Sequence, residues 1–332
     1  MNLDRLRACL DTDHVRASHV AVVGVGGSSH FITNLARCGV RRFTLVDPDS
    51  VEPANVARQG FRHDQIGLRK VSGAAAAIRT VSPAATVHEL PVDFTTLDDE
   101  GVTRAFAGVN LFVFATDSFA AQARGNQVAL LLGVPAIWIG LFAGGLGGEV
   151  VFWHDGIASC FRCLLSNRFA MQEQARKENR RLDPPSDGVT ILDTDFVDAV
   201  AGHVALGLLT RGADNRFGRL IDTLGQRNYL LVKIDPRHRT AGRDVVREQL
   251  GVSETAEAFF GWTTAAMSDP TAGKEVCPDC VKYRQPADGD ETRVEASSVI
   301  TPAALLPASP SSVPSDAPTG SRTAPPAPAS DE

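Results

Sequence analysis

Neither long apolar runs nor an excess of basic residues occurs in this chain. Its 332 residues include 33 Lys and Arg against 39 Asp and Glu, for a formal net charge of −6. Binding to nucleic-acid phosphates needs a basic surface, so we do not expect nucleic acid as the main partner. The longest apolar stretch, 128–139, contains Gly133 and Pro135 and is too short to cross a bilayer. Because the polar residues 1–15 do not fit a signal peptide either, we expect a soluble, cytoplasmic protein.

Cysteine is scarce, but its spacing is informative. Four of the six cysteines form two Cys-x-x-Cys pairs, Cys160/Cys163 and Cys277/Cys280. In a reducing compartment such pairs favour a metal over disulfides, although a redox role for each pair is the alternative. Four thiolates complete a closed tetrahedral zinc site, which leaves no open position for catalysis. We therefore predict a structural Zn²⁺ that joins distant segments of one domain.

Short apolar runs alternate with helix-like segments in the first half of the chain. This alternation predicts an α/β fold with a mainly parallel sheet. The predicted strands are 19–25, 43–47, 86–90, 111–116 and 135–140, and the predicted helices are 28–37, 70–81 and 118–132. After residue 142 the pattern changes, and we expect an antiparallel extension of the same sheet. Its predicted elements are strands 149–153 and 229–234, a helix over 196–209, and a charged helix or mobile loop over 169–181.

The end of the chain has a different composition. From Pro286 onward no aromatic residue occurs, and Pro, Ala and Ser dominate. Such a segment buries too little apolar surface to offset the entropy of ordering. We therefore predict a folded domain over 1–283 and a disordered tail over 284–332.

A glycine-rich turn joins the first predicted strand to a helix. Gly24, Gly26 and Gly27 allow a tight turn in which backbone N–H groups approach a phosphate, although such a motif alone can be merely a turn. Asp47 and Asp49 end the next predicted strand, where an acid can hold ribose hydroxyls. A pair of turn acids beside Pro48 is the alternative. Up to this point the pattern fits NAD and ATP equally.

Two cations and one acid favour ATP. Arg58 and Lys70 follow the ribose acids, and they would neutralise the charge that develops on a triphosphate during attack. Asp117 comes at the carboxyl end of the buried strand 111–116, where Mg²⁺ could take a carboxylate and phosphate oxygens as ligands. The alternative for Asp117 is an N-cap of the following helix.

In order and spacing, these motifs resemble those of the ThiF/MoeB-type adenylyltransferases, relatives of the ubiquitin-activating enzymes. The resemblance covers about residues 15–282. It rests on both cysteine pairs and on Gly24-Val-Gly-Gly27, Leu45-Val-Asp-Pro-Asp49, Asn55-Val-Ala-Arg-Gln59, Gly67-Leu-Arg-Lys70 and Thr116-Asp-Ser-Phe119. It implies a Rossmann-like doubly wound sheet and a homodimer that uses MgATP. The implied reaction is adenylation of the C-terminal carboxylate of a ubiquitin-like or sulfur-carrier protein or peptide.

The resemblance also implies roles for single residues. Asp49 would hold the ribose, Asn55, Arg58 and Lys70 the phosphates, and Asp117 the magnesium ion. Gln59 lies in the same motif and is counted with the nucleotide-binding residues. The role of Arg124, on the helix after Asp117, stays open.

The chain departs from the family pattern in three places. Ser29 replaces the usual third glycine of the loop, which is tolerated if its φ is negative. Arg5 and Arg7 lack the usual motif around the N-terminal arginine that relatives extend to a partner subunit, and a solvated helix is the alternative. Cysteine is absent between Cys163 and Cys277, so we expect no internal thioester.

A substrate carboxylate, with a pKa of about 3.5, is already ionised at neutral pH, so adenylation needs no general base. This agrees with the lack of a clear catalytic histidine; His30 either lines the site or has a surface or packing role. Three alternatives stay open: an NAD-dependent oxidoreductase, an ATP-dependent dehydratase acting on modified tRNA, and a binding module without catalysis. Arg58 and Lys70 argue against the first, and the low basic content and the four cysteines against the second.

Overall fold

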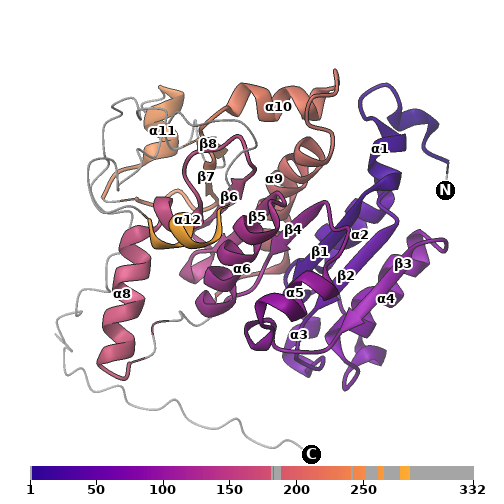
Figure 1. Ribbon diagram of the computed structural model, residues 1–332, viewed down its shortest axis with the longest axis horizontal. Coiled ribbons are helices and arrows are strands. Elements are labelled where there is room, and N and C mark those ends of the chain that lie inside the picture. The colour runs from indigo at the N-terminus through magenta and orange to yellow at the C-terminus, as the bar shows by residue number, and fades with distance from the viewer. Residues whose placement is uncertain are drawn as a thin grey trace, which may run out of the picture.

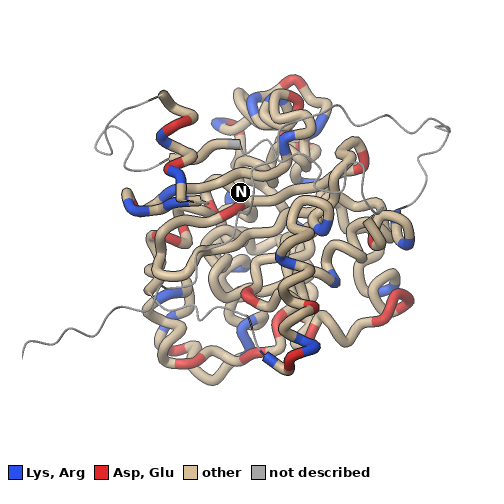
Figure 2. The backbone as a smooth tube through the Cα atoms, turned by 90° about the vertical axis from the view of Figure 1, so that its left-hand side faces the viewer, with Lys and Arg blue, Asp and Glu red and all other residues tan. Residues whose placement is uncertain are grey.

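A computed structural model describes residues 2–180, 182, 188–240, 242–251, 261–264 and 277–284. In this part of the chain eight strands form one sheet in the order β3-β2-β1-β4-β5-β6-β7-β8 (Figure 1). Helices pack on both faces. The Trp138 indole N–H donates to the Gln122 carbonyl on α6 (Phe119–Leu132), whereas Val197 on α9 (Ile191–Leu209) packs near Gly148 on the opposite face. Figure 2 shows both signs of charge interspersed along the backbone.

The parallel half confirms the predicted alternation. It consists of β1 (His19–Val23), β2 (Arg42–Val46), β3 (Thr86–Leu90), β4 (Leu111–Phe114) and β5 (Ala136–Leu141). Every residue of β4 is buried, as expected of a central strand that is covered on both faces. Helices α2 (Ser29–Arg37), α4 (Lys70–Val81) and α6 lie within one residue of their predicted bounds.

The second half extends the sheet with antiparallel strands, as predicted. These are β6 (Gly147–Trp153), β7 (Tyr229–Lys233) and β8 (Gly261–Thr264). The sequence analysis missed β8 and most one- or two-turn helices, because a short element shows no full period. The missed helices are η1 (Asp4–Leu6), α1 (Thr12–Ala17), α3 (Pro53–Val56), η2 (His63–Gln65), η3 (Phe94–Thr96), α5 (Asp99–Ala105), η4 (Ala143–Gly145), α7 (Phe161–Leu164), α10 (Arg216–Leu224), α11 (Val245–Leu250) and α12 (Pro278–Tyr283).

Two helices of the second half begin earlier than predicted. The charged segment is a helix, α8 (Ser166–Lys177). Helix α9 begins after a capping box, in which the Asp193 carboxylate accepts the Thr190 N–H at 2.7 Å and the Thr190 hydroxyl accepts the Asp193 N–H at 3.3 Å. The apolar run that predicted this helix starts only at Phe196, so its polar first turn was missed.

A buried ion pair fixes α8 to the antiparallel half of the sheet. Both carboxylate oxygens of Glu149 on β6 accept hydrogen bonds from the Arg168 guanidinium, at 2.6 and 3.0 Å, and the Tyr229 hydroxyl donates to Glu149 at 2.7 Å. Burial opposes ionisation, but Arg168 and Tyr229 hold the pKa of Glu149 below its usual range. Losing Arg168 would leave the buried Glu149 carboxylate without its counter-charge, a change that typically costs about 3–5 kcal/mol.

Part of the predicted domain organisation lies outside the described residues. Of the predicted tail, only Arg284 is described, and its guanidinium donates to the Ile157 carbonyl. Within the described residues no helix is both long enough and apolar enough to span a bilayer.

Helix α9 carries one buried acid that lacks a full set of partners. Asp198 lies on the helix that packs against α2, and its Oδ2 has no hydrogen-bond partner among the described residues. Burial, with the nearby Asp195 charge, raises the pKa of Asp198 well above its usual value. There is therefore a pH range in which the Asp198 carboxyl is protonated in the folded protein and ionised in the unfolded chain.

We predict that Asp198→Asn stabilises the protein increasingly as the pH rises. Above about pH 4 the unfolded state releases the Asp198 proton and the folded state keeps it. Wild-type stability then falls by up to about 1.4 kcal/mol per pH unit until the folded-state pKa is passed. The variant does not lose stability in this way. Urea unfolding should therefore show that its free energy of unfolding exceeds that of the wild type by more at pH 8 than at pH 5. Exposed Asp214→Asn is the control, and an equal effect at both pH values would contradict the prediction.

Candidate functional site

The ends of three parallel strands meet at one edge of the sheet. Val23 at the end of β1 pairs with Val46 of β2 and with Phe114 of β4. The Gly24 N–H then donates to the Val46 carbonyl, and the Ala115 N–H to the Val23 carbonyl, each at 2.9 Å. The glycine turn, the acids after β2 and the Thr116–Asp117 segment are therefore neighbours, as the sequence predicts for an open α/β sheet.

Gly24 is required by the geometry of the turn, and Gly26 is crowded by a neighbouring side chain. Gly24 has φ = +83°, and a Cβ there would lie 2.6 Å from the Ala115 carbonyl oxygen. A Cβ on Gly26 would lie 2.7 Å from the Gln59 amide. Gly27 is less crowded, since its Cβ would meet only the Thr194 methyl group at 3.7 Å. The backbone near Gly27 is thus accessible at the N-terminus of α2, where N–H groups favour an anion.

Two serines tie this turn to its surroundings. The Ser28 hydroxyl donates to the Gly24 carbonyl at 2.9 Å, which closes the turn. Ser29 is the first residue of α2 and has a negative φ, so replacement of the usual glycine introduces no backbone strain. Its hydroxyl oxygen accepts the Gly60 N–H at 2.7 Å. Ser29 therefore joins the start of α2 to the segment that contains Arg58 and Gln59.

The two acids after β2 have different surroundings. Asp47 is buried, and its oxygens accept the N–H groups of Val25 and Asp49, each at 3.0 Å. Burial raises the pKa of Asp47, although Lys70 and these hydrogen bonds oppose the shift. Asp49 has a side chain that is 62% exposed, and it pairs with the Lys70 ammonium at 2.9 Å. This geometry gives Asp47 a positioning role in the loop and leaves Asp49 accessible to a ribose.

The segment after Asp49 forms a turn beside the glycine loop. The buried Asn55 side-chain oxygen accepts the Glu52 N–H at 2.8 Å and shapes the start of α3. The Arg58 N–H donates to the Asn55 carbonyl at 3.1 Å, so the half-buried Arg58 sits on this turn. Gln59 lies against Gly26, and its buried Oε1 has no hydrogen-bond partner among the described residues. A polar ligand in the loop would supply the partner that this oxygen lacks.

Asp117 is exposed at the carboxyl end of β4. The N-cap of α6 is Ser118, whose hydroxyl accepts the Ala121 N–H at 3.3 Å, so the alternative N-cap role for Asp117 is wrong. Arg124 further along α6 pairs with Asp99 at 2.7 Å, which holds α5 against α6.

The other residues singled out from the sequence lie at the surface. Nδ1 of His30 on α2 pairs with Asp195 on α9 at 2.9 Å, and both side chains are partly exposed. Arg5 and Arg7 lie exposed near η1, and Arg7 pairs with Asp4 at 3.6 Å.

The two cysteine pairs meet in a single cluster. None of the six cysteines forms a disulfide, and the sulfur atoms of Cys160, Cys163, Cys277 and Cys280 lie within 4.8 Å of one another. Sulfur separations of 3.6, 3.7 and 3.8 Å match the spacing of about 3.8 Å that a tetrahedral zinc with Zn–S bonds near 2.3 Å requires. The cluster thus fits a closed structural zinc site.

A buried hydrogen-bond network behind the cysteines was not predicted from the sequence. Asn126 on α6 accepts the Phe161 N–H at 3.1 Å and donates to Asp279 at 2.9 Å. Asp279 also accepts a hydrogen bond from Arg162 at 2.9 Å. Asn126 thus bonds to both cysteine segments. The only signals in the sequence were one amide inside an apolar helix and one acid inside a Cys-x-x-Cys pair.

We predict that the purified protein contains one zinc ion per chain and that its removal destabilises the fold. Metal binding to preorganised thiolates contributes directly to folding free energy. A chelator should therefore lower the midpoint of thermal unfolding by at least about 5 °C, because each 1 kcal/mol is roughly 2–4 °C in a domain of this size. Cys277→Ser should lose the metal, whereas Cys38→Ser, outside the cluster, should keep it. Mass-spectrometric metal analysis that finds no zinc would reject the site.

Comparison with known proteins decides the family. The ThiF family model matches residues 4–215, more than half of the chain. This chain belongs to the ThiF family. Ubiquitin-like modifier-activating enzyme 5 of Drosophila melanogaster is 30% identical over 173 residues, which are 49% of this chain and 43% of that protein. The Oryza sativa subsp. japonica protein of the same name is 25% identical over 323 residues, 92% of this chain and 73% of that protein.

Solved structures share the fold of this ThiF-family chain. E. coli MccB, crystallised with AMPCPP and MccA, has a TM-score of 0.53 and 18% identity, and the match covers 67% of this chain and 62% of MccB. PaaA has the same TM-score and identity, with 67% and 71% covered. The match to the fly relatives spans less than half of their length. At 18% identity, the likeness to the solved structures describes the fold alone. The family model confirms, at the level of the family, the resemblance inferred from the motifs.

Proposed function

We propose that this protein is an ATP-dependent adenylyltransferase that activates the C-terminal carboxylate of a ubiquitin-like or sulfur-carrier protein, or of a peptide, as an acyl-adenylate. The observation that carries the proposal is the meeting of the glycine loop, the Asp49–Lys70 pair and Asp117 at one sheet edge. Family membership supports it, as do the names of the relatives, which describe activation of ubiquitin-like modifiers. MccB of the same fold was crystallised with ATP and with MccA.

The residues at this edge supply binding and charge neutralisation. The backbone N–H groups of the loop and the N-terminus of α2 would hold the phosphates, and Asp49 would hold the ribose. Lys70 is only 12% exposed and is oriented by Asp49, so its charge acts in a poorly hydrated position. Arg58 would supply a second cation. Asp117 would hold Mg²⁺, which neutralises phosphate charge when it is bound.

The reaction needs no proton transfer. The ionised substrate carboxylate attacks the α-phosphorus of ATP and forms a new O–P bond. The bond from this phosphorus to the bridging oxygen breaks, and pyrophosphate leaves with the electron pair. Catalysis would then consist of orientation and electrostatic stabilisation, for which the Lys70 and Arg58 cations are suited.

The proposed chemistry ends at the adenylate without an enzyme thioester. No cysteine occurs between Cys163 and Cys277, and both pairs lie in the four-cysteine cluster that could hold a metal. Cys38 follows the last residue of α2, about 13 Å along the helix from the loop. Burial also raises the pKa of the Cys38 thiol, which makes it a poor nucleophile. The acceptor would therefore attack the acyl-adenylate itself. A cytoplasmic homodimer is part of the proposal, and light scattering tests the dimer.

We predict that Lys70→Met lowers the rate of substrate-dependent ATP–pyrophosphate exchange by about 100-fold or more, since loss of one preorganised charge contact typically costs that much. Asp117→Asn should cause a similar loss. Lys282→Met, at an exposed position on α12, is the matched control and should keep the wild-type rate. The first substrates to test are small proteins ending in Gly-Gly that are encoded beside this gene.

Two results would reject the proposal. One is exchange that survives Lys70→Met with an unchanged rate. The other is tight binding of NADH together with no measurable binding of MgATP by calorimetry, which would indicate an oxidoreductase on the same fold.

A further inference from the structure

A segment of the antiparallel half continues the edge at which the glycine loop lies. Strand β7 is antiparallel to β6, which is antiparallel to β5, so β7 ends at the same edge as the parallel strands. The N–H groups of Ile234 and Asp235 donate to the Leu146 carbonyl at 3.1 and 3.0 Å. The ring of His238 stacks on that of Phe142, just after β5, with centroids 5.2 Å apart. The polypeptide after β7 therefore lies at the same edge of the sheet as the candidate site.

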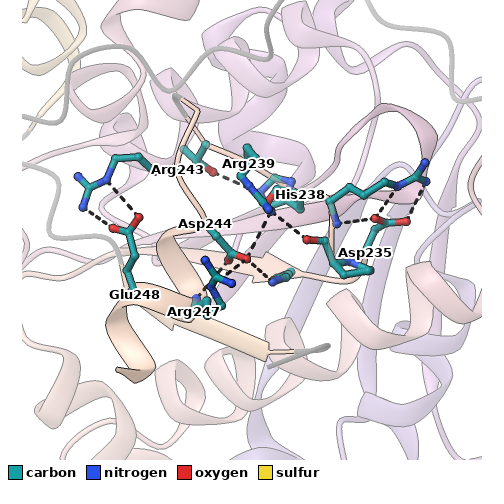
Figure 3. A network of polar contacts seen from close by, with 11 residues as sticks. Asp235, His238, Arg239, Arg243, Asp244, Arg247 and Glu248 are labelled. Atoms are coloured by element: carbon teal, nitrogen blue, oxygen red, sulfur yellow. Dashed lines mark hydrogen bonds and ion pairs between the residues drawn. The ribbon is translucent and has the colours of Figure 1, made fainter. Parts of the chain in front are cut away.

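This polypeptide is rich in arginine. We call residues 233–240 and 242–248 the basic segment (Figure 3). Its cations outnumber its acids by five to three in a chain whose formal net charge is −6. The cations are Lys233, Arg237, Arg239, Arg243 and Arg247, and the acids are Asp235, Asp244 and Glu248. His238 adds no charge at neutral pH, because burial lowers its pKa.

Three of the cations surround one buried carboxylate. The fully buried Lys233 ammonium lies 2.6 Å from Oδ2 of Asp244. The guanidinium groups of Arg239 and Arg247 approach the same oxygen at 3.4 and 3.9 Å. The Arg239 side chain also reaches solvent, since it is 41% exposed.

Among the described residues, the two outer cations pair with acids that lie close to them in the sequence. Arg237 is 82% exposed and pairs with Asp235, and Arg243 is 69% exposed and pairs with Glu248. Water screens exposed pairs of this kind, so the arginines can turn to the carboxylates of a partner at little cost. Guanidinium groups bind carboxylates with two parallel hydrogen bonds, which favours acidic side chains as the ligand.

The strand order sets the lateral spacing between the ends of β1 and β7, after which the glycine loop and most of the basic segment follow. Strands β1 and β7 are separated by four strand spacings, in the order β1-β4-β5-β6-β7. At about 4.8 Å each these amount to about 19 Å, which an extended chain covers in about six residues.

We propose that the basic segment binds acidic side chains that lie about six residues before the C-terminal carboxylate of the substrate. This inference rests on the proposed function, since it assumes that the carboxylate is held beside the glycine loop. A protein or peptide fits better than a nucleic acid, because three acids are interleaved with the five cations and would repel a continuous row of phosphates. The segment would thus select substrates by the position of their negative charge.

The test uses two fluorescent twelve-residue peptides with the full-length protein. Both end in Gly-Gly with a free carboxylate, and they carry either three Glu or three Gln centred six residues before it. Fluorescence anisotropy without nucleotide should show that the Glu peptide binds about tenfold more tightly. Arg237→Gln and Arg239→Gln should each weaken Glu-peptide binding about three- to tenfold and leave Gln-peptide binding unchanged. Arg104→Gln, which replaces an exposed arginine on α5, should change neither affinity.

The outcomes separate this inference from the proposed function. Equal binding of the two peptides, or binding of neither, overturns the inference, whether or not a substrate supports ATP–pyrophosphate exchange. A Glu preference that the arginine variants abolish supports an acid-binding segment. If no candidate substrate then supports ATP–pyrophosphate exchange, the proposed function fails, but the basic segment still stands as a binding site for acidic side chains. Weaker binding of bulk tRNA to Arg239→Gln, without any peptide preference, would assign the segment to nucleic acid and overturn the inference.

Discussion

The parallel pairing of β1 with both β2 and β4 is the constraint on which the candidate site depends. It brings the glycine turn, the acids after β2 and Asp117 to one edge, although they lie far apart in the sequence. Gly24 sits between the other two strand ends so tightly that even one methyl group would meet the Ala115 carbonyl. A shift of β1 by one residue would turn its side chains to the other face and move the turn out of this position.

Polar side chains then hold the loops in a defined arrangement. Asp47 uses its two oxygens for backbone N–H groups of the glycine turn and of its own strand end. Ser29 holds Gly60, and Lys70 is held by Asp49. All of these bonds are made between groups of the protein itself. Such preorganisation reduces the reorganisation needed when negative charge develops on a phosphate.

Much of the parallel half could be predicted from the sequence, because its strands and helices are long enough to show their periods. The cysteine cluster was also predictable, since ligand type and spacing are local features. Strand β8 and the first turn of α9 were missed: the strand is short, and the helix starts with Thr190 and Asp193 rather than apolar residues. The roles of Asp47 and Asn126 depend on contacts between distant segments, which no local pattern reveals.

The two halves of the sheet divide the proposed work between chemistry and selection. Chemistry would use the parallel half, whose strand ends form the candidate nucleotide site. Selection of the substrate would use the basic segment in the antiparallel half, provided that the two halves of the sheet keep a fixed separation. The Glu149–Arg168–Tyr229 contacts join β6, α8 and β7, and the cysteine cluster with Asn126 joins α6 to α7 and α12. A structural zinc ion without a role in the reaction would then matter for specificity, because it would help to hold the helices on this side of the sheet, and with them the path of a substrate tail, in place.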